Sequence, residues 1–143
     1  MTTTSVPEPH AADEQAQTAL RGLAGSMSAD DLATPVPMSP EWTVLDVVAH
    51  VTGIVSDIAT GNLAGVGTQE WTAAQVASRQ GRSLAELADE WRARWSEVVP
   101  RLVDDKASCI RMTADLVVHV HDVAMVTGEV VDRDDAGVRI GLE

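Results

Sequence analysis

The chain has 143 residues, of which 45% are hydrophobic and 22% charged, with one cysteine and a net charge of −12. These values predict one globular domain with its own core and exclude a disordered chain. The negative charge argues against nucleic acid or an anionic membrane as a partner, since both require a basic face. The single cysteine excludes a disulfide framework and a multi-cysteine zinc cluster, which favours the reducing cytoplasm. The sequence contains neither a signal peptide nor an apolar run of the roughly 18 residues that mark a transmembrane helix.

Residues 1–10 are polar and include two prolines, which predicts a disordered tail ahead of a domain that occupies residues 11–143. The first helix is expected at about 11–27, where alanines and leucines recur at helical spacing. Three prolines follow between residues 35 and 40, and they favour a loop of extended backbone.

The second helix has a clear start and a clear end. Thr43 is a good N-cap residue, and Asp46 three positions later suits the first turn of a helix. A wide stripe of valines and isoleucines continues from there until Gly61, which is expected to end the helix. A shorter helix is expected at 69–78.

Two more long helices complete the predicted domain. The helix at 83–103 begins with Ser83 and Glu86 in a capping-box pattern, and Pro100 is expected to kink or fray its last turn. The helix at 112–127 is apolar nearly all round, which indicates a central position covered on several sides. Four long helices joined by modest loops predict an all-α four-helix bundle.

Side chains with metal-ligand chemistry are expected to meet inside this bundle. Asp115 and His119 are four residues apart, so they share one face of their helix, and Asp122 lies on the same stripe. His50 lies on the buried face of its own helix. Metal sites in bundles use inward side chains from facing helices, and catalytic zinc sites combine three protein ligands with an open position. The alternative is a pair of partly buried histidines that hydrogen-bond to nearby carboxylates.

The other candidate residues have weaker support. His121 is rotated about 200° from His119 on a helix that turns about 100° per residue. His10 lies in or beside the tail and is expected to be exposed. Cys109 is expected in a loop after the acidic pair at 104–105, whose charges would raise the pKa of its thiol and make it unreactive. Neither a G-x-S-x-G elbow nor a phosphate-binding loop is present.

Three stretches of the chain carry a family resemblance. Residues 39–51, SPEWTVLDVVAHV, resemble the signature P-x-W-[ST]-V-x-D-V-x-A-H-L. Residues 115–122 resemble a second signature, E-x-x-x-H-x-x-D, and the LATP stretch at 32–35 also agrees. These features resemble mycothiol-dependent maleylpyruvate isomerase-like proteins of the DinB-like superfamily. The resemblance covers about residues 12–135.

The resemblance implies a DinB-like four-helix bundle that holds a divalent metal ion, usually zinc. The ligands that it implies are a histidine of the second helix and an acid-x-x-x-His pair of the last, which are His50, Asp115 and His119 here. Family enzymes bind the small thiol mycothiol at the metal, which would stabilise a thiolate for isomerisation or S-transfer on an electrophilic substrate. Asp122 could then orient one of these ligands without binding the metal itself. The arginine-rich composition agrees with an actinobacterial source.

Two features depart from the family pattern. Asp115 stands where the family commonly has glutamate, and its side chain is one methylene shorter. The isomerases also carry a C-terminal domain that contributes to the active site, and the chain ends at Glu143 before any such domain. Because residues 138–143 resume an apolar pattern and then stop without a cap, we expect the chain to be a fragment. The rival hypotheses are a non-enzymatic regulatory or interaction bundle and a degenerate fragment with a purely structural core.

Overall fold

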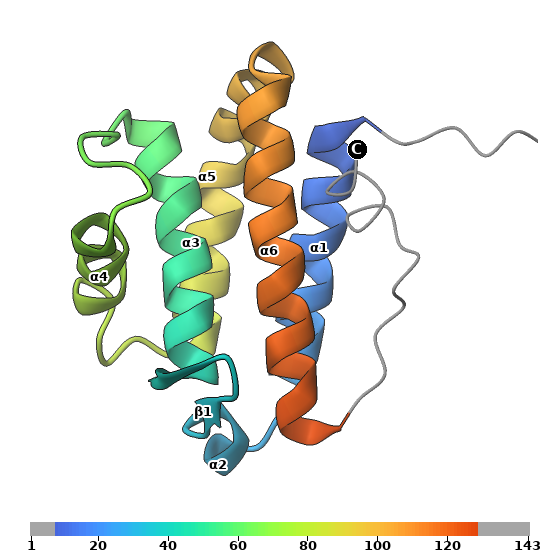
Figure 1. Ribbon diagram of the computed structural model, residues 1–143, viewed down its shortest axis with the longest axis vertical. Coiled ribbons are helices and arrows are strands. Elements are labelled where there is room, and N and C mark those ends of the chain that lie inside the picture. Colours follow the sequence, from blue (N-terminus) through green and yellow to red (C-terminus); the bar gives the residue numbers. More distant parts are fainter. Residues whose placement is uncertain (1–7, 129–143) are drawn as a thin grey trace, which may run out of the picture.

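The computed structural model describes residues 8–128, which form a bundle of helices (Figure 1). The elements within this range are α1 (Pro9–Gly25), α2 (Ala29–Leu32), β1 (Pro35–Val36), β2 (Ser39–Thr43), α3 (Val44–Thr60), α4 (Gln69–Ala77), α5 (Leu84–Asp104) and α6 (Lys106–Thr127). The four long helices α1, α3, α5 and α6 confirm the predicted all-α four-helix bundle. None of the described helices combines the length and the apolar character needed to cross a membrane. The apolar pattern at 138–143 and most of the predicted tail lie outside the described residues.

Local hydrogen bonds explain why two helix starts could be predicted. At the start of α3, Thr43 Oγ1 accepts a hydrogen bond from the Asp46 N–H at 3.2 Å, and the Asp46 carboxylate accepts one from the Thr43 N–H at 3.0 Å. This reciprocal capping box satisfies two backbone donors that the helix itself cannot. Ser83 caps α5 by accepting a hydrogen bond from the Glu86 N–H at 3.1 Å. The predicted end of α3 is also confirmed, since Gly61 has a φ of 75°, which favours glycine.

The start of α6 differs from the prediction. The helix begins at Lys106 rather than near Met112. Asp105 caps it by accepting a hydrogen bond from the Ser108 N–H at 3.1 Å, so the short connection after α5 leads directly into a helix. Cys109 therefore lies within α6 and is fully buried, and the prediction of a loop at this position is wrong.

α5 runs through Pro100 to Asp104, and Val98 and Leu102 on either side of the proline are buried. The expectation for α6 is corrected. α6 is not covered all round, since Val118 and Met125 are each 57% exposed. Each helix of a four-helix bundle keeps one side toward solvent, and the uniformly apolar composition of α6 concealed which side that is.

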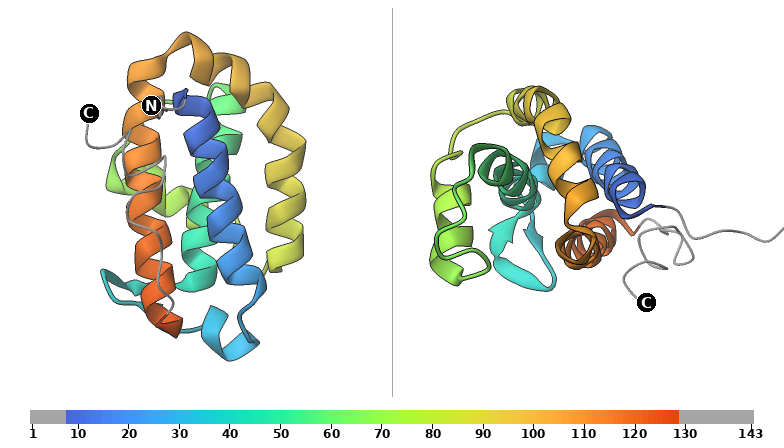
Figure 2. Two further views of the ribbon diagram at one scale, coloured as in Figure 1. Left: turned by 90° about the vertical axis from the view of Figure 1, so that its right-hand side faces the viewer. Right: turned by 90° about the horizontal axis from the view of Figure 1, so that it is seen from above.

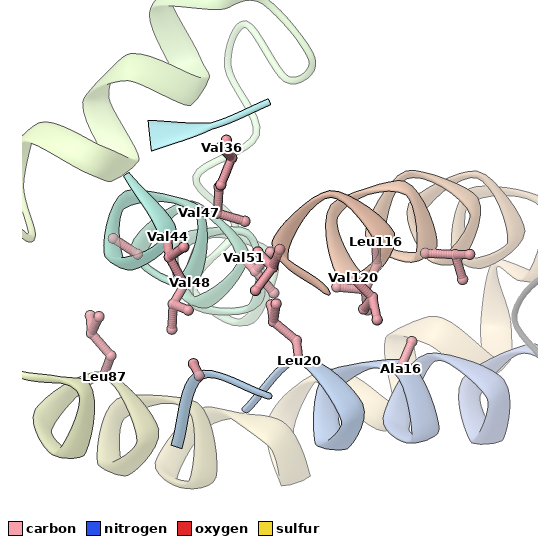
Figure 3. Close-up of a cluster of buried hydrophobic side chains, with 14 residues drawn as sticks. Ala16, Leu20, Val36, Val44, Val47, Val48, Val51, Leu87, Leu116 and Val120 are labelled. Carbon is pink, nitrogen blue, oxygen red and sulfur yellow. The ribbon is translucent and has the colours of Figure 1, made fainter. Parts of the chain in front are cut away.

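The long helices pack in two close pairs. α1 lies along α6 and α3 lies along α5, whereas α3 and α6 touch each other little. α4 covers the outer side of α3 (Figure 2). The main core lies between α1, α3 and α6 and consists largely of valine, leucine and alanine side chains (Figure 3). The weak contact between α3 and α6 leaves a place for polar side chains between them.

The segment between α2 and α3 forms an antiparallel β-hairpin where extended loop backbone was predicted. β1 pairs with β2, and Val36 of β1 is fully buried in the main core. The Met38 N–H, at the turn of the hairpin, donates a hydrogen bond to Asp122 Oδ1 of α6 at 2.9 Å. Asp122 is itself buried, so its carboxylate anchors the hairpin to the bundle. This hydrogen bond ties the turn of the hairpin to α6.

Candidate metal centre

His50 lies near the middle of α3 and is almost completely buried, with 5% of its surface exposed. Val47 and Val51 on the same helix are also buried, so the apolar spacing places His50 toward the interior. Trp42 of β2 packs on the imidazole, with ring centroids 5.3 Å apart and ring planes tilted by 44°. The hairpin therefore covers one side of His50.

α6 supplies two more side chains. His119 Nε2 lies 3.3 Å from Asp115 Oδ2, which is the pairing that their four-residue spacing predicts. The side chain of His119 is 14% exposed, and that of Asp115 is 57% exposed. The site is therefore closed at His50 and open to solvent at Asp115. Such an opening allows an ion and a further ligand to enter.

The three side chains converge between α3 and α6. One ligand atom from each of His50, Asp115 and His119 lies within 4.8 Å of the other two. The rings of the two histidines meet edge to face with their centroids 5.2 Å apart. Two imidazole nitrogens and one carboxylate oxygen are a donor set that zinc takes in catalytic sites, where a fourth position stays open. The residues present therefore fit a divalent metal ion.

Burial and hydrogen bonding favour the ligating forms of two of these groups. Burial lowers the pKa of His50 below its ordinary value, because the charged ring would lose its hydration. The hydrogen bond with His119 lowers the pKa of Asp115 and outweighs the opposite effect of burial. A neutral imidazole and an ionised carboxylate are the forms that bind metals.

Gln75 and Asp57 lie beside the site, and the sequence analysis identified neither. His50 Nδ1 and Gln75 Oε1 of α4 lie 2.8 Å apart, and Gln75 Nε2 donates a hydrogen bond to Asp57 Oδ2 at 2.8 Å. Gln75 and His50 belong to different helices, so no spacing along the sequence indicates their contact. Trp42 did carry a signal, since it is the tryptophan of the first signature, just before the cap of α3.

The other candidates lie outside this group. His121 and Asp122 are not among the converging residues, and the hydrogen bond that Asp122 makes is to the Met38 N–H of the hairpin. His10 is half-buried in the first turn of α1, so the expectation of an exposed residue is corrected. Burial, with a smaller contribution from Asp13, raises the pKa of Cys109 to about 11. The raised pKa agrees with the predicted unreactive thiol, but its main cause is burial and not the acidic pair at 104–105.

A pocket of about 650 Å³ opens beside the cluster, and Asp115 forms part of its lining. Its walls are mainly apolar and come from α3, α4, α5, α6 and the loop after α3. They include Ile54, Ile58, Trp71 and Met112. This volume lies within the roughly 300–1,000 Å³ typical of small-molecule sites. The pocket can therefore accommodate a small molecule with an apolar body next to the candidate ligands.

The fold and the site define a class of protein: an all-α bundle with a His/Asp/His group between two of its helices. A family model described as the mycothiol maleylpyruvate isomerase N-terminal domain matches residues 14–131. The chain therefore belongs to this mycothiol-related, DinB-like family, as its two signatures indicated. No curated protein and no solved structure matches the chain.

Proposed function

We propose that His50, Asp115 and His119 bind one divalent metal ion, zinc, and that the protein uses it to activate mycothiol for attack on an electrophile. The observation that supports this proposal most is the convergence of three ligand atoms within 4.8 Å from two helices that otherwise touch little. Direct hydrogen bonding explains the proximity of Asp115 and His119, but it does not explain why His50 joins them.

When bound, a zinc ion lowers the pKa of a thiol that it ligates and so supplies a nucleophile at neutral pH. Trp42 packs on His50 and closes that side of the site. Asp115 and His119 come from α6 on the more open side. The exposed side of Asp115 is the route by which a thiol can reach the site. A thiol-dependent reaction requires a compartment that keeps thiols reduced, so we place it in the cytoplasm.

We assign the pocket beside Asp115 to the electrophilic substrate. Its apolar walls suit a hydrocarbon body, and its lining carries both arginines and aspartates that can hold polar groups of the substrate. In an S-transfer, the thiolate sulfur forms a C–S bond and the leaving group departs with its electron pair. In an isomerisation, the thiol adds across a C=C bond, the resulting single bond rotates, and elimination returns the thiol. Both reactions use the same nucleophile and the same pocket.

The test is a titration of mycothiol in the presence of the protein, followed by the ultraviolet absorbance of the thiolate. We expect the zinc-loaded protein to lower the pKa of the thiol, and we expect the zinc-free protein and the His119→Ala variant to leave it unchanged. If the loaded protein leaves the pKa of the thiol unchanged, thiol activation is wrong. A folded protein that also binds no metal would support the interaction or structural bundle.

A further inference from the structure

We propose that Gln75 is a positioning residue that fixes the tautomer of His50, with the proton on Nδ1 and the lone pair on Nε2. The role of this tautomer in metal binding rests on the proposed function. The tautomer itself is a property of the metal-free protein and can be measured separately.

The argument follows a chain of two hydrogen bonds from Asp57 through Gln75 to His50. Gln75 Nε2 donates to Asp57 Oδ2 at 2.8 Å, and Gln75 Oε1 lies 2.8 Å from His50 Nδ1. An ionised carboxylate can only accept hydrogen bonds, so Asp57 requires the NH₂ group of the amide to face it. The amide oxygen must then face His50. Because an amide oxygen also only accepts, His50 Nδ1 has to be the donor.

A neutral imidazole that carries its proton on Nδ1 has its one available lone pair on Nε2. Gln75 therefore leaves Nε2 as the nitrogen of His50 that can bind a metal ion. Histidine ligands commonly donate their other N–H to a carboxylate, a carbonyl oxygen or a water molecule, which fixes the ring orientation. Gln75 provides a carbonyl oxygen of this kind, and Asp57 determines which way its amide is turned.

The fold holds Gln75 tightly in this position. Gln75 is 2% exposed, and α4 approaches α3 closely at Gly53, one turn after His50. A Cβ atom at Gly53 would lie 2.6 Å from the Cβ of Gln75, a distance that real structures do not show. Arg79 Nη1 donates a hydrogen bond to the backbone carbonyl of Gln75 at 3.1 Å, and Arg79 pairs with Glu90 of α5. α4 is therefore packed against α3 and tied to α5 through Arg79 and Glu90, with Gln75 beside His50.

The first experiment observes His50 in the metal-free protein by long-range ¹H–¹⁵N NMR, at a pH well above the ordinary histidine range. We expect a protonated Nδ1 and an unprotonated Nε2. The Gln75→Leu variant, which removes the acceptor at similar volume, should give a mixture of tautomers. The matched control is Gln80→Leu, because Gln80 lies just beyond α4 and its amide donates hydrogen bonds to Asp46 and to the Val76 backbone carbonyl. A parent protein with the proton on Nε2, or an unchanged tautomer in Gln75→Leu, would overturn the proposal.

The second experiment measures zinc affinity by competition with a chelator. Gln75→Leu should bind zinc about 10–100-fold more weakly than the parent, while Gln80→Leu should match it. The double variant Asp57→Asn with Gln75→Glu reverses the donor and acceptor between the two side chains but still presents an oxygen to His50. It should restore the parent tautomer and most of the zinc affinity. Equal zinc affinity in the parent and in a folded Gln75→Leu variant would contradict the positioning role.

The two experiments separate this proposal from the proposed function. If the parent binds no zinc but shows the expected tautomer, metal binding fails and the Gln75–His50 relationship stands. If the parent binds zinc and its tautomer does not respond to Gln75, the metal site stands and the positioning role fails. Circular dichroism of each variant confirms that it is folded, and the double variant provides a second answer if Gln75→Leu does not fold.

Discussion

The imidazole rings of His50 and His119 lie 5.2 Å apart, edge to face, although they come from α3 and α6, two long helices that touch each other little. Most of the surrounding contacts are apolar, and the helices could have closed this space with valine or leucine. Burying two imidazoles costs free energy, which Gln75 offsets at His50 Nδ1 and Asp115 offsets at His119 Nε2; a shared metal ion would bind the three groups together. This relationship is the basis of the predictions about metal binding.

Substitution of Asp115 distinguishes a ligand from a surface carboxylate. We expect Asp115→Ala to weaken zinc binding by at least about tenfold, since it removes the oxygen donor from the set. We expect Asp115→Glu to retain binding, because the resembled family commonly has glutamate at this position. Asp104→Ala is the matched control, as Asp104 lines the same pocket but lies outside the converging group. Chelator competition measures all three, and equal affinity in Asp115→Ala and Asp104→Ala would exclude Asp115 as a ligand.

Gly53 should be needed for the close approach of α4 to α3. We expect Gly53→Ala to lower the free energy of unfolding by about 1–3 kcal/mol, because its methyl group would overlap the side chain of Gln75. Gly22→Ala in α1 is the control, since nothing lies within 4 Å of a Cβ there. That variant should be stabilised by roughly 0.5–1 kcal/mol through a lower entropy cost in the helix. Urea unfolding compares them, and an equally stabilised Gly53→Ala would show that the helices do not pack this closely.

The hydrogen bond from the Met38 N–H to the buried Asp122 should stabilise the hairpin without contributing to the metal site. We expect Asp122→Ala to lower the free energy of unfolding by about 1–3 kcal/mol, because the Met38 N–H loses a charged acceptor. Asp122→Asn keeps an oxygen acceptor and should lose less. Zinc stoichiometry should be unchanged in both variants. Loss of zinc from a folded Asp122→Asn variant would instead return Asp122 to the role of orienting a ligand.

Asp13 should make the fold less stable as the pH rises from about 4 to about 7. Burial between α1 and α6 raises its pKa from 3.8 to about 6, against the effect of hydrogen bonds with Thr113 and Gln17. The folded state therefore holds the proton more tightly than the unfolded chain does. The resulting stabilisation is complete below the unfolded pKa and is lost as the pH rises through the folded pKa.

The Asp13→Asn variant tests this pH dependence. It cannot ionise, so it should lose the dependence and should exceed the parent in unfolding free energy near neutral pH by on the order of 1–3 kcal/mol. Urea unfolding of both proteins across this pH range provides the measurement. A difference between parent and variant that stays constant with pH would mean that Asp13 does not titrate in the folded protein.

The elements that could be predicted from the sequence are those set by local chemistry. The capping residues of α3 and α5, the glycine that ends α3 and the four-residue spacing of Asp115 and His119 each act within one or two helical turns. The pairing of His50 with that group needed a further assumption, that inward faces of two helices meet in a bundle. The family signatures supported the same three residues independently.

The features that the sequence did not reveal depend on contacts between distant segments. Gln75 reaches His50 only because α4 folds back over α3 at Gly53, and no pattern within α4 records that approach. The contact of Asp122 with Met38 likewise depends on where the hairpin is placed. The early start of α6 has a local signal in its cap Asp105, but two adjacent aspartates are equally typical of a loop.

The proposed function requires His50, Asp115 and His119 to form a metal site. The most direct test is the metal content of the purified protein, measured by mass spectrometry beside His50→Ala and His119→Ala variants that remain folded. The proposed site predicts about one zinc ion per parent chain and its loss from both variants. A parent protein that contains no stoichiometric metal, even after reconstitution with zinc, would contradict the claim and leave the two histidines as parts of a polar contact between helices.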